Sequence, residues 1–89
     1  MRIKKGFVLR QVCGESVVMG EGLEAVHFGK ILALNETSAW LWQQAVTLGD
    51  FTTDVLAGKL CEVYDVQPAE AQADVAAMVA EWQEMKVVE

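Results

Sequence analysis

The hydrophobic period of this 89-residue chain changes once, near Asn35, and that change predicts its architecture. Before Asn35, apolar and polar residues alternate over short stretches separated by glycines, a pattern typical of antiparallel strands. After Asn35, apolar residues recur every three or four positions, a pattern typical of amphipathic helices. Helices segregated to one side of a small antiparallel sheet make an α+β domain. We therefore expect an α+β, winged-helix-like fold with a three-stranded antiparallel sheet followed by three helices.

Three strand candidates precede Asn35: residues 7–12, residues 16–19 and the longer apolar stretch 25–34. A short turn at 13–15 separates the first two. Two glycines within residues 20–22 end the second strand, and Gly29 suggests a bulge or tight turn within the third stretch. Hairpin connections fit these spacings best.

Three helix starts carry local signals. Asn35 is a good N-cap for a helix that runs to about Thr47, and Thr52 resembles the N-cap of a second helix. Pro68 suits the first position of a third helix, which runs to about Met85.

The apolar stripe of each helix predicts which face is buried. In the first helix Trp40 falls opposite the stripe, and in the second Val55 points away from it. The stripes comprise Ala39, Leu41, Trp42, Ala45, Val46 and Leu48 in the first helix, Leu56, Ala57, Leu60, Cys61 and Tyr64 in the second, and Ala71, Val75, Met78, Val79, Trp82 and Met85 in the third.

Size and apolar content limit the class of protein. A chain of 89 residues builds one hydrophobic core, so we expect a single domain over 1–89. The longest apolar run, residues 75–80, is too short to span a bilayer, so no membrane partner is expected. The first residues lack the pattern of a signal peptide, and a cytoplasmic location is the default expectation.

The charge distribution argues against nucleic acid. Residues 1–30 contain five basic and three acidic residues, whereas residues 31–89 contain two basic and ten acidic residues. Affinity for nucleic acid comes mainly from lysine and arginine at phosphates, so this acidic two-thirds would repel it. The third helix is the one that a DNA-binding winged helix could use to contact bases, and it has no Lys or Arg inside it.

No catalytic or metal-binding constellation is present in the sequence. His27 is the only histidine, and Cys13 and Cys61 are 48 positions apart with no C-x-x-C spacing. The two cysteines are expected to be buried small hydrophobes, with a disulfide between them left open. No glycine-rich phosphate loop occurs. Glu81 and Glu84, one helical turn apart, are typical of a solvated face. We therefore expect no enzyme and no cofactor.

Protein binding is the class of function that remains. The third strand is expected to end the sheet, and an edge strand can accept a further strand from an extended peptide. The stripe of the third helix is interpreted mainly as core, with its outer part, including Met78 and Met85, facing such a groove. The alternative is a structural or regulatory domain that self-associates as a homodimer through the strand edge, Trp40 and Val55, or by domain swapping about residues 20–22.

The segment Asn35-Glu36-Thr37-Ser38-Ala39-Trp40-Leu41-Trp42 resembles the Asn-Glu-Thr segment of the coenzyme PQQ synthesis protein D (PqqD-like) family. Residues 5–10 resemble the opening strand of that family, and residues 30–34 its strand before the first helix. Thr52 and the segment Tyr64-Asp65-Val66 resemble its second helix start and its tyrosine connector. Two departures are Val55, where the family has an acid, and residues 85–88, which replace a Gly-Leu-Leu ending.

The resemblance implies a non-catalytic peptide chaperone, a RiPP recognition element of the kind used in PQQ biosynthesis. Such a domain binds the leader of a ribosomally made precursor peptide by strand addition and presents it to a modifying enzyme, often a radical SAM protein. Carried onto this chain, the resemblance implies a peptide-binding groove formed by Val26, His27, Phe28, Lys30, Ile31, Leu32 and Ala33, with a helical wall of Val75, Met78, Val79 and Trp82.

Overall fold

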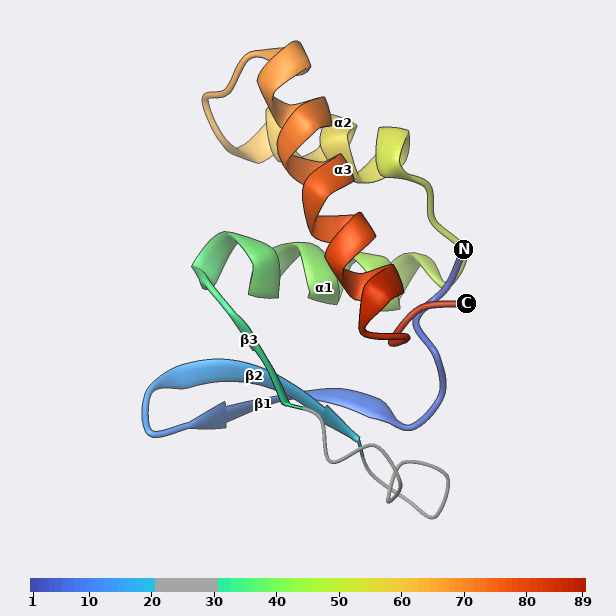
Figure 1. Ribbon diagram of the computed structural model, residues 1–89. Helices are drawn as coiled ribbons and strands as arrows, with labels where there is room; N and C mark the ends of the chain where they lie inside the picture. Colours follow the sequence, from blue (N-terminus) through green and yellow to red (C-terminus); the bar gives the residue numbers. More distant parts are fainter. Residues whose placement is uncertain (21–30) are drawn as a thin grey trace.

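The computed structural model describes residues 1–20 and 31–89, which form three strands followed by three helices (Figure 1). The strands are β1 (Phe7–Val12), β2 (Glu15–Gly20) and β3 (Ile31–Leu34), and each pairs antiparallel with the next. The strand order β1-β2-β3 makes β2 the central strand. The predicted α+β fold is confirmed. Its likeness to a winged helix is loose, because the likeness extends only to this set of strands and helices.

A tight hairpin joins β1 to β2. Val12 pairs with Glu15, so Cys13 and Gly14 alone form the loop, with φ angles of 53° and 80°. Positive φ at both positions is the signature of a type I′ turn, whose twist matches that of the flanking strands. Cys13 is therefore held at an exposed hairpin tip, and its predicted burial is wrong. Cys61 is half-buried, and both thiols are free.

Side-chain caps fix the starts of two helices where the sequence predicts them. The Asn35 carboxamide oxygen accepts a hydrogen bond from the Ser38 N–H at 2.8 Å and begins α1 (Glu36–Leu48). The Thr52 hydroxyl accepts from the Val55 N–H at 3.1 Å and begins α2 (Thr53–Val63). Each cap satisfies an N–H that has no partner within the helix. Pro68 occupies the first position of α3 (Pro68–Glu84), as predicted.

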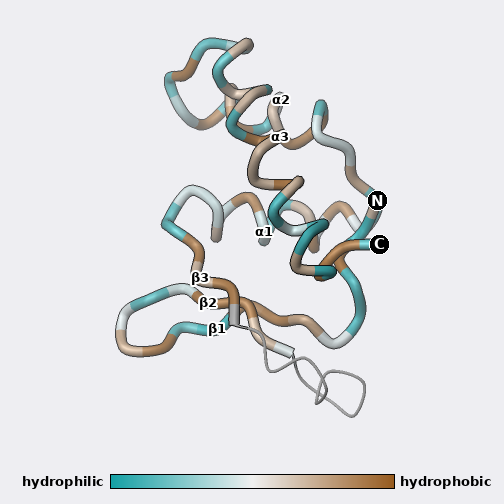
Figure 2. The backbone as a smooth tube through the Cα atoms, in the orientation of Figure 1, coloured by the Kyte–Doolittle hydropathy of each residue, from teal (hydrophilic) through white to brown (hydrophobic). Residues whose placement is uncertain are grey.

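An aromatic cluster occupies the centre of the core. The Trp42 and Trp82 rings meet edge to face with centroids 5.1 Å apart, and Phe51 meets Trp82 in the same way at 6.4 Å. Each tryptophan is 1% exposed. These contacts join α1 and α3 to the segment that precedes α2. Figure 2 shows hydrophobic stretches along the strands and at the C-terminal end of the chain.

The two chain ends lie side by side and close the core (Figure 1). Arg2 and Glu89 exchange two backbone hydrogen bonds of 2.9 and 2.8 Å, and the Lys4 N–H donates to the Val87 carbonyl at 2.9 Å. Val87 and Val88 are buried. The ending that departs from the PqqD pattern therefore supplies apolar side chains to the core and pairs with the N-terminal segment.

Two expectations about α1 are wrong. Val46 is 55% exposed and Leu48 is 39% exposed, although both belong to the predicted stripe. Their end of the helix borders a cleft beside β1 that no described element fills. The apolar stripe is therefore wider than the part of α1 that other elements cover. Trp40, predicted on the solvent face, is half-buried because its ring meets the Tyr64 ring edge to face at 5.6 Å.

Among the described helices, none combines the length and apolar character needed to cross a bilayer.

The end of α3 contains an unusual backbone conformation at Lys86, with φ of 60°. The Val87 N–H donates to the Trp82 carbonyl and the Lys86 N–H to the Gln83 carbonyl, both at 3.1 Å. This is the Schellman arrangement, which places the residue after the helix cap in the left-handed region that glycine adopts without steric cost.

We expect Lys86→Gly to raise the free energy of unfolding by about 1 kcal/mol, because it removes the steric cost of this conformation. Urea denaturation monitored by tryptophan fluorescence measures the change. Glu84→Gly, one residue inside the helix, is the matched control and should lower stability by about 1 kcal/mol. A Lys86→Gly protein no more stable than the parent would contradict the assignment.

Candidate functional site

The open edge of β3 is the first component of the candidate site. Among the described residues β3 pairs only with β2, in a register that joins Ser16 to Leu34 and Val18 to Leu32. β3 therefore ends the described sheet, as predicted. Leu32 is buried and Ala33 is exposed, so successive side chains alternate between the core and the surface. Such an edge leaves backbone donors and acceptors available to a further strand.

The predicted groove residues divide into two groups. Ile31, Leu32 and Ala33 form the first three positions of β3. The rest of the strand side of the groove lies outside the described residues: Val26, His27, Phe28 and Lys30.

The predicted helical wall is mainly core. Val75, Val79 and Trp82 are at most 3% exposed, which supports the interpretation of most of this stripe as core. Met78 and Met85 are half-buried and pack against the edge of the core, so they form the outer part of the stripe. An unbranched thioether side chain adapts its shape to different neighbours. Met78 is therefore the residue of the predicted wall whose side chain has accessible surface for a bound segment.

A cavity of about 380 Å³ lies beside Met78, where the chain passes from β3 into α1. Leu41 and Val75 give it an apolar floor, while Asn35 and Tyr64 contribute polar atoms at its rim. The sequence identifies Asn35 only as a helix cap and Tyr64 only as a stripe residue, because neither pattern shows that α1, α2 and α3 meet here. Asn35, which directly follows β3, places the cavity next to the end of that strand.

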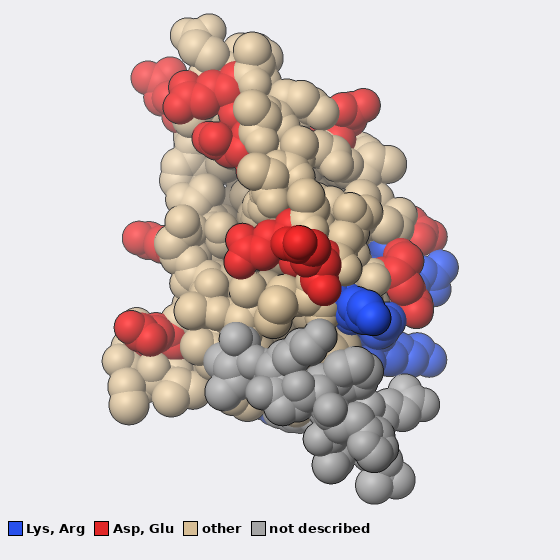
Figure 3. All heavy atoms as spheres, viewed as in Figure 1, with Lys and Arg blue, Asp and Glu red and all other residues tan. Residues whose placement is uncertain are grey.

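Acidic side chains border this region. The exposed residues of α3 include four acids and, within the helix, no Lys or Arg: Glu70, Asp74, Glu81 and Glu84. Asp74 lines the cavity itself. Figure 3, in the view of Figure 1, shows acidic side chains in groups over the helical part of this face. A guest at this site meets negative charge.

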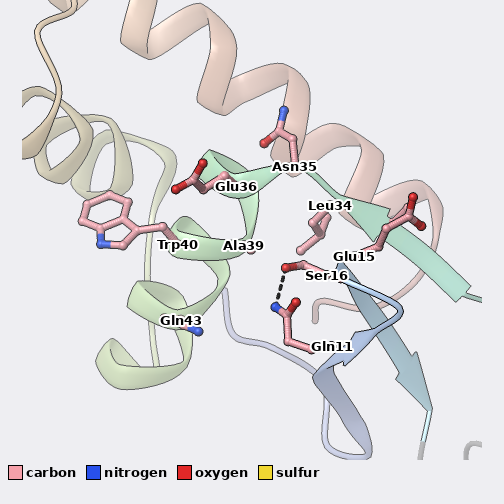
Figure 4. Close-up of a pocket in the computed structure, with 11 residues that line it drawn as sticks. Gln11, Glu15, Ser16, Leu34, Asn35, Glu36, Ala39, Trp40 and Gln43 are labelled. Atoms are coloured by element: carbon pink, nitrogen blue, oxygen red, sulfur yellow. Dashed lines mark hydrogen bonds between the residues drawn. The ribbon is translucent and has the colours of Figure 1, made fainter.

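A larger hollow of about 700 Å³ lies between α1 and the tip of the β1–β2 hairpin (Figure 4). Gln11 donates a hydrogen bond to the Ser16 hydroxyl at 2.6 Å on the strand side, whereas Gln43 approaches from α1. The Trp40 ring is directed away from the strands, which agrees with its contact with Tyr64. The Glu15 and Glu36 carboxylates lie on opposite sides and point away from each other, so the hollow does not bring these acids together.

Groups suited to metal binding are also not assembled in the part of the chain that the structure describes. Within 1–20 and 31–89, no three His, Cys, Asp or Glu side chains lie close enough together to hold a metal ion. The geometry of the described residues thus offers backbone edges and apolar surface for binding.

The family model described as coenzyme PQQ synthesis protein D (PqqD) matches residues 15–88. The chain belongs to the PqqD family. The match includes β2, β3 and all three helices, so it covers every element that forms the candidate site.

Two solved structures share this fold. One is TbiB1 in complex with the TbiA(beta) leader peptide, with a TM-score of 0.80 and 15% identity over 100% of this chain and 95% of that one. The other is lasso peptide synthetase B1 complexed with the leader peptide, with a TM-score of 0.71 and 23% identity over 93% of this chain and 89% of that one. A search of curated proteins gives no match. At these identities the two structures establish the fold that this PqqD-family chain shares with them.

Asn35 links the fold to the candidate site, since it caps α1 and lines the cavity beside Met78. We expect Asn35→Ala to lower the free energy of unfolding by about 1 kcal/mol, because the Ser38 N–H loses its acceptor. Asn35→Asp should retain the cap and most of the stability. Thermal unfolding followed by circular dichroism measures the stability of both variants. Equal losses of stability in the two would show that the cap is not the source of the loss.

Proposed function

We propose that this PqqD-family chain, as a single domain over residues 1–89, is a peptide chaperone. It binds the leader of a ribosomally made precursor peptide and presents the peptide to a modifying enzyme, a radical SAM protein. The observation that carries the proposal is the open edge of β3 next to the cavity at Met78. The two structural neighbours, each a complex with a leader peptide, support it.

In this proposal the leader pairs with β3 as a fourth strand. Backbone hydrogen bonds to β3 supply affinity that is largely independent of sequence, and pockets for alternate side chains supply specificity. The segment from Val26 to Ala33 provides the pairing surface, with Ala33 already exposed to a guest. A leader side chain directed toward the helices enters the cavity between Asn35 and Met78.

The helical wall has two layers in this proposal. Met78 contacts the leader directly because part of its side chain is accessible. Val75, Val79 and Trp82 are buried in the core, and Trp82 packs against Trp42 of α1, so their contribution is support.

The chaperone contributes no chemistry of its own in this proposal. Catalysis requires polar groups that converge in a concavity, and in the hollow beside the β1–β2 hairpin the acids Glu15 and Glu36 point away from each other. The reaction on the peptide therefore falls to the partner enzyme. Both partners are encountered in the cytoplasm, where the precursor peptide is made.

The structure disfavours self-association through Trp40. Its ring packs on Tyr64 and is half-buried, so it offers less apolar surface than the sequence predicts. Val55 is 44% exposed, as expected, but a lone exposed apolar residue is ordinary on a protein surface. Peptide binding therefore explains the open β3 edge better than a homodimer formed through these residues.

Met78→Gln tests the proposed groove, since it keeps the side-chain length and places an amide where an apolar group meets the guest. We expect the affinity for the leader of its precursor peptide to fall five- to ten-fold, equivalent to about 1–1.4 kcal/mol. Isothermal titration calorimetry measures the change. Ala80→Gln, exposed on the other side of α3, is the matched control and should change affinity less than two-fold.

Amide shifts in the ¹⁵N-labelled domain locate the same binding event. The leader should perturb residues 31–34 together with residues 75–82. Shifts confined to loops, or equal losses in the Met78 and Ala80 variants, would exclude this groove.

A further inference from the structure

The sheet has a second open edge, at β1. Among the described residues β1 pairs only with β2, so it lies on the side of the sheet opposite β3. An apolar cleft of about 340 Å³ runs between β1 and the end of α1, lined by Val8 and Leu9 from the strand and by Trp42 and Val46 from the helix. Val46 is 55% exposed. A terminal strand with an apolar helical flank is the arrangement that strand addition uses.

A basic rim adjoins this cleft. A neighbouring hollow of about 470 Å³ shares Phe7 and Val46 with the cleft and is also lined by Arg2, Lys4 and Lys5. Asp50 is the one acid in the described lining of the two hollows, and it is already engaged by Arg2 at 3.4 Å. In Figure 3 the Lys and Arg side chains gather on one side of the molecule, with several acidic side chains next to them.

We infer that β1, Val46, Leu48, Lys4 and Lys5 form a second docking surface, here called the β1 surface, for an extended segment that alternates apolar and acidic side chains. Its occupant is an acidic strand of the modifying enzyme, and this part of the inference rests on the proposed function. The apolar side chains fill the cleft under Val46, and the acidic ones meet the lysines. Electrostatic complementarity of this kind speeds encounter and selects the partner.

A second copy of this chain is a poorer match for the lysine rim than an acidic strand. β1 contains Arg10 and no acidic residue, so a second copy paired through β1 would bring no carboxylate of its strand to Lys4 and Lys5. The leader peptide is also a poor occupant while it pairs with β3. The two edges are separated by the width of the sheet, roughly 10 Å at the usual strand spacing, so both can be occupied at once.

Two blocked nine-residue peptides test the β1 surface, one alternating glutamate with valine and the other alternating lysine with valine. We titrate each into the ¹⁵N-labelled full-length domain. The glutamate peptide should perturb the amides of residues 7–12 and 45–49 at a concentration at least ten-fold lower than the lysine peptide requires. Val46→Gln and Lys5→Glu should each weaken this response at least five-fold.

Val63→Gln and Lys59→Glu are matched controls on α2, where Val63 is 61% exposed. They should change the response less than two-fold. Equal responses to the two peptides, or equal losses in the control and test variants, would overturn the inference. Glutamate-peptide shifts limited to residues 31–34 and 75–82 would also overturn it, because the acidic segment would then use only the β3 groove.

The two proposals fail separately in this experiment. Failure of the β1 surface leaves the leader-induced shifts at β3 intact, whereas failure of the proposed function removes those shifts and leaves the response of β1 to the glutamate peptide. Sedimentation of the free domain should show a monomer. A dimer that Val46→Gln dissociates would identify a second copy as the occupant and overturn the assignment of an acidic partner.

Discussion

The edge-to-face contact between Trp42 and Trp82 positions the parts of the candidate site relative to one another. Trp42 belongs to α1, which follows β3 after the single residue Asn35, and Trp82 belongs to α3. The ring contact therefore sets where α3 lies with respect to the edge of β3. Phe51 and the buried C-terminal valines enclose the same cluster, so the chain ends contribute to this placement as well. A groove between a strand and a helix depends on this rigid support because its width is set by core packing.

The small size of the sheet determines how much backbone is left open. Three strands have two edges, and the described helices cover the sheet on the side shown above it in Figure 1 without pairing with either edge. Open edges invite aggregation unless they are short or charged. β3 has only four residues, and the segment that leads into β1 contains Lys4 and Lys5. These features limit pairing between copies while leaving each edge accessible to a partner of suitable sequence.

Much of the fold follows from local signals that a sequence displays directly. The caps at Asn35 and Thr52 and the proline at position 68 act within one helical turn, so the starts of α1, α2 and α3 could be predicted closely. The extent of burial could not. A helical wheel gives the direction of Val46 and Leu48 but not whether a neighbouring element reaches far enough to cover them. Trp40 is the opposite case, since its partner Tyr64 comes from the end of a different helix.

The candidate site shows the same limit. The position of β3 at the end of the sheet follows from strand order along a chain of hairpins, whereas the separation of Met78 from Val75, Val79 and Trp82 depends on tertiary packing. All four share one stripe in the sequence, and the packing of α3 against α2 and against Trp42 of α1 decides which are enclosed.

The two edges of the sheet differ in the charge that surrounds them, and this difference suits each edge to a different kind of segment. The acids of α3 border the β3 groove, whereas lysines and Arg2 border the cleft at β1. An extended segment that suits one edge is therefore disfavoured at the other, because like charges placed together cost free energy while opposite charges favour encounter. Two equivalent edges would let one partner occupy both, so the difference in charge separates the partners that we propose for the two edges. In this chain the distinction is made by side chains outside the strands, so the strands themselves retain the plain backbone that pairing requires.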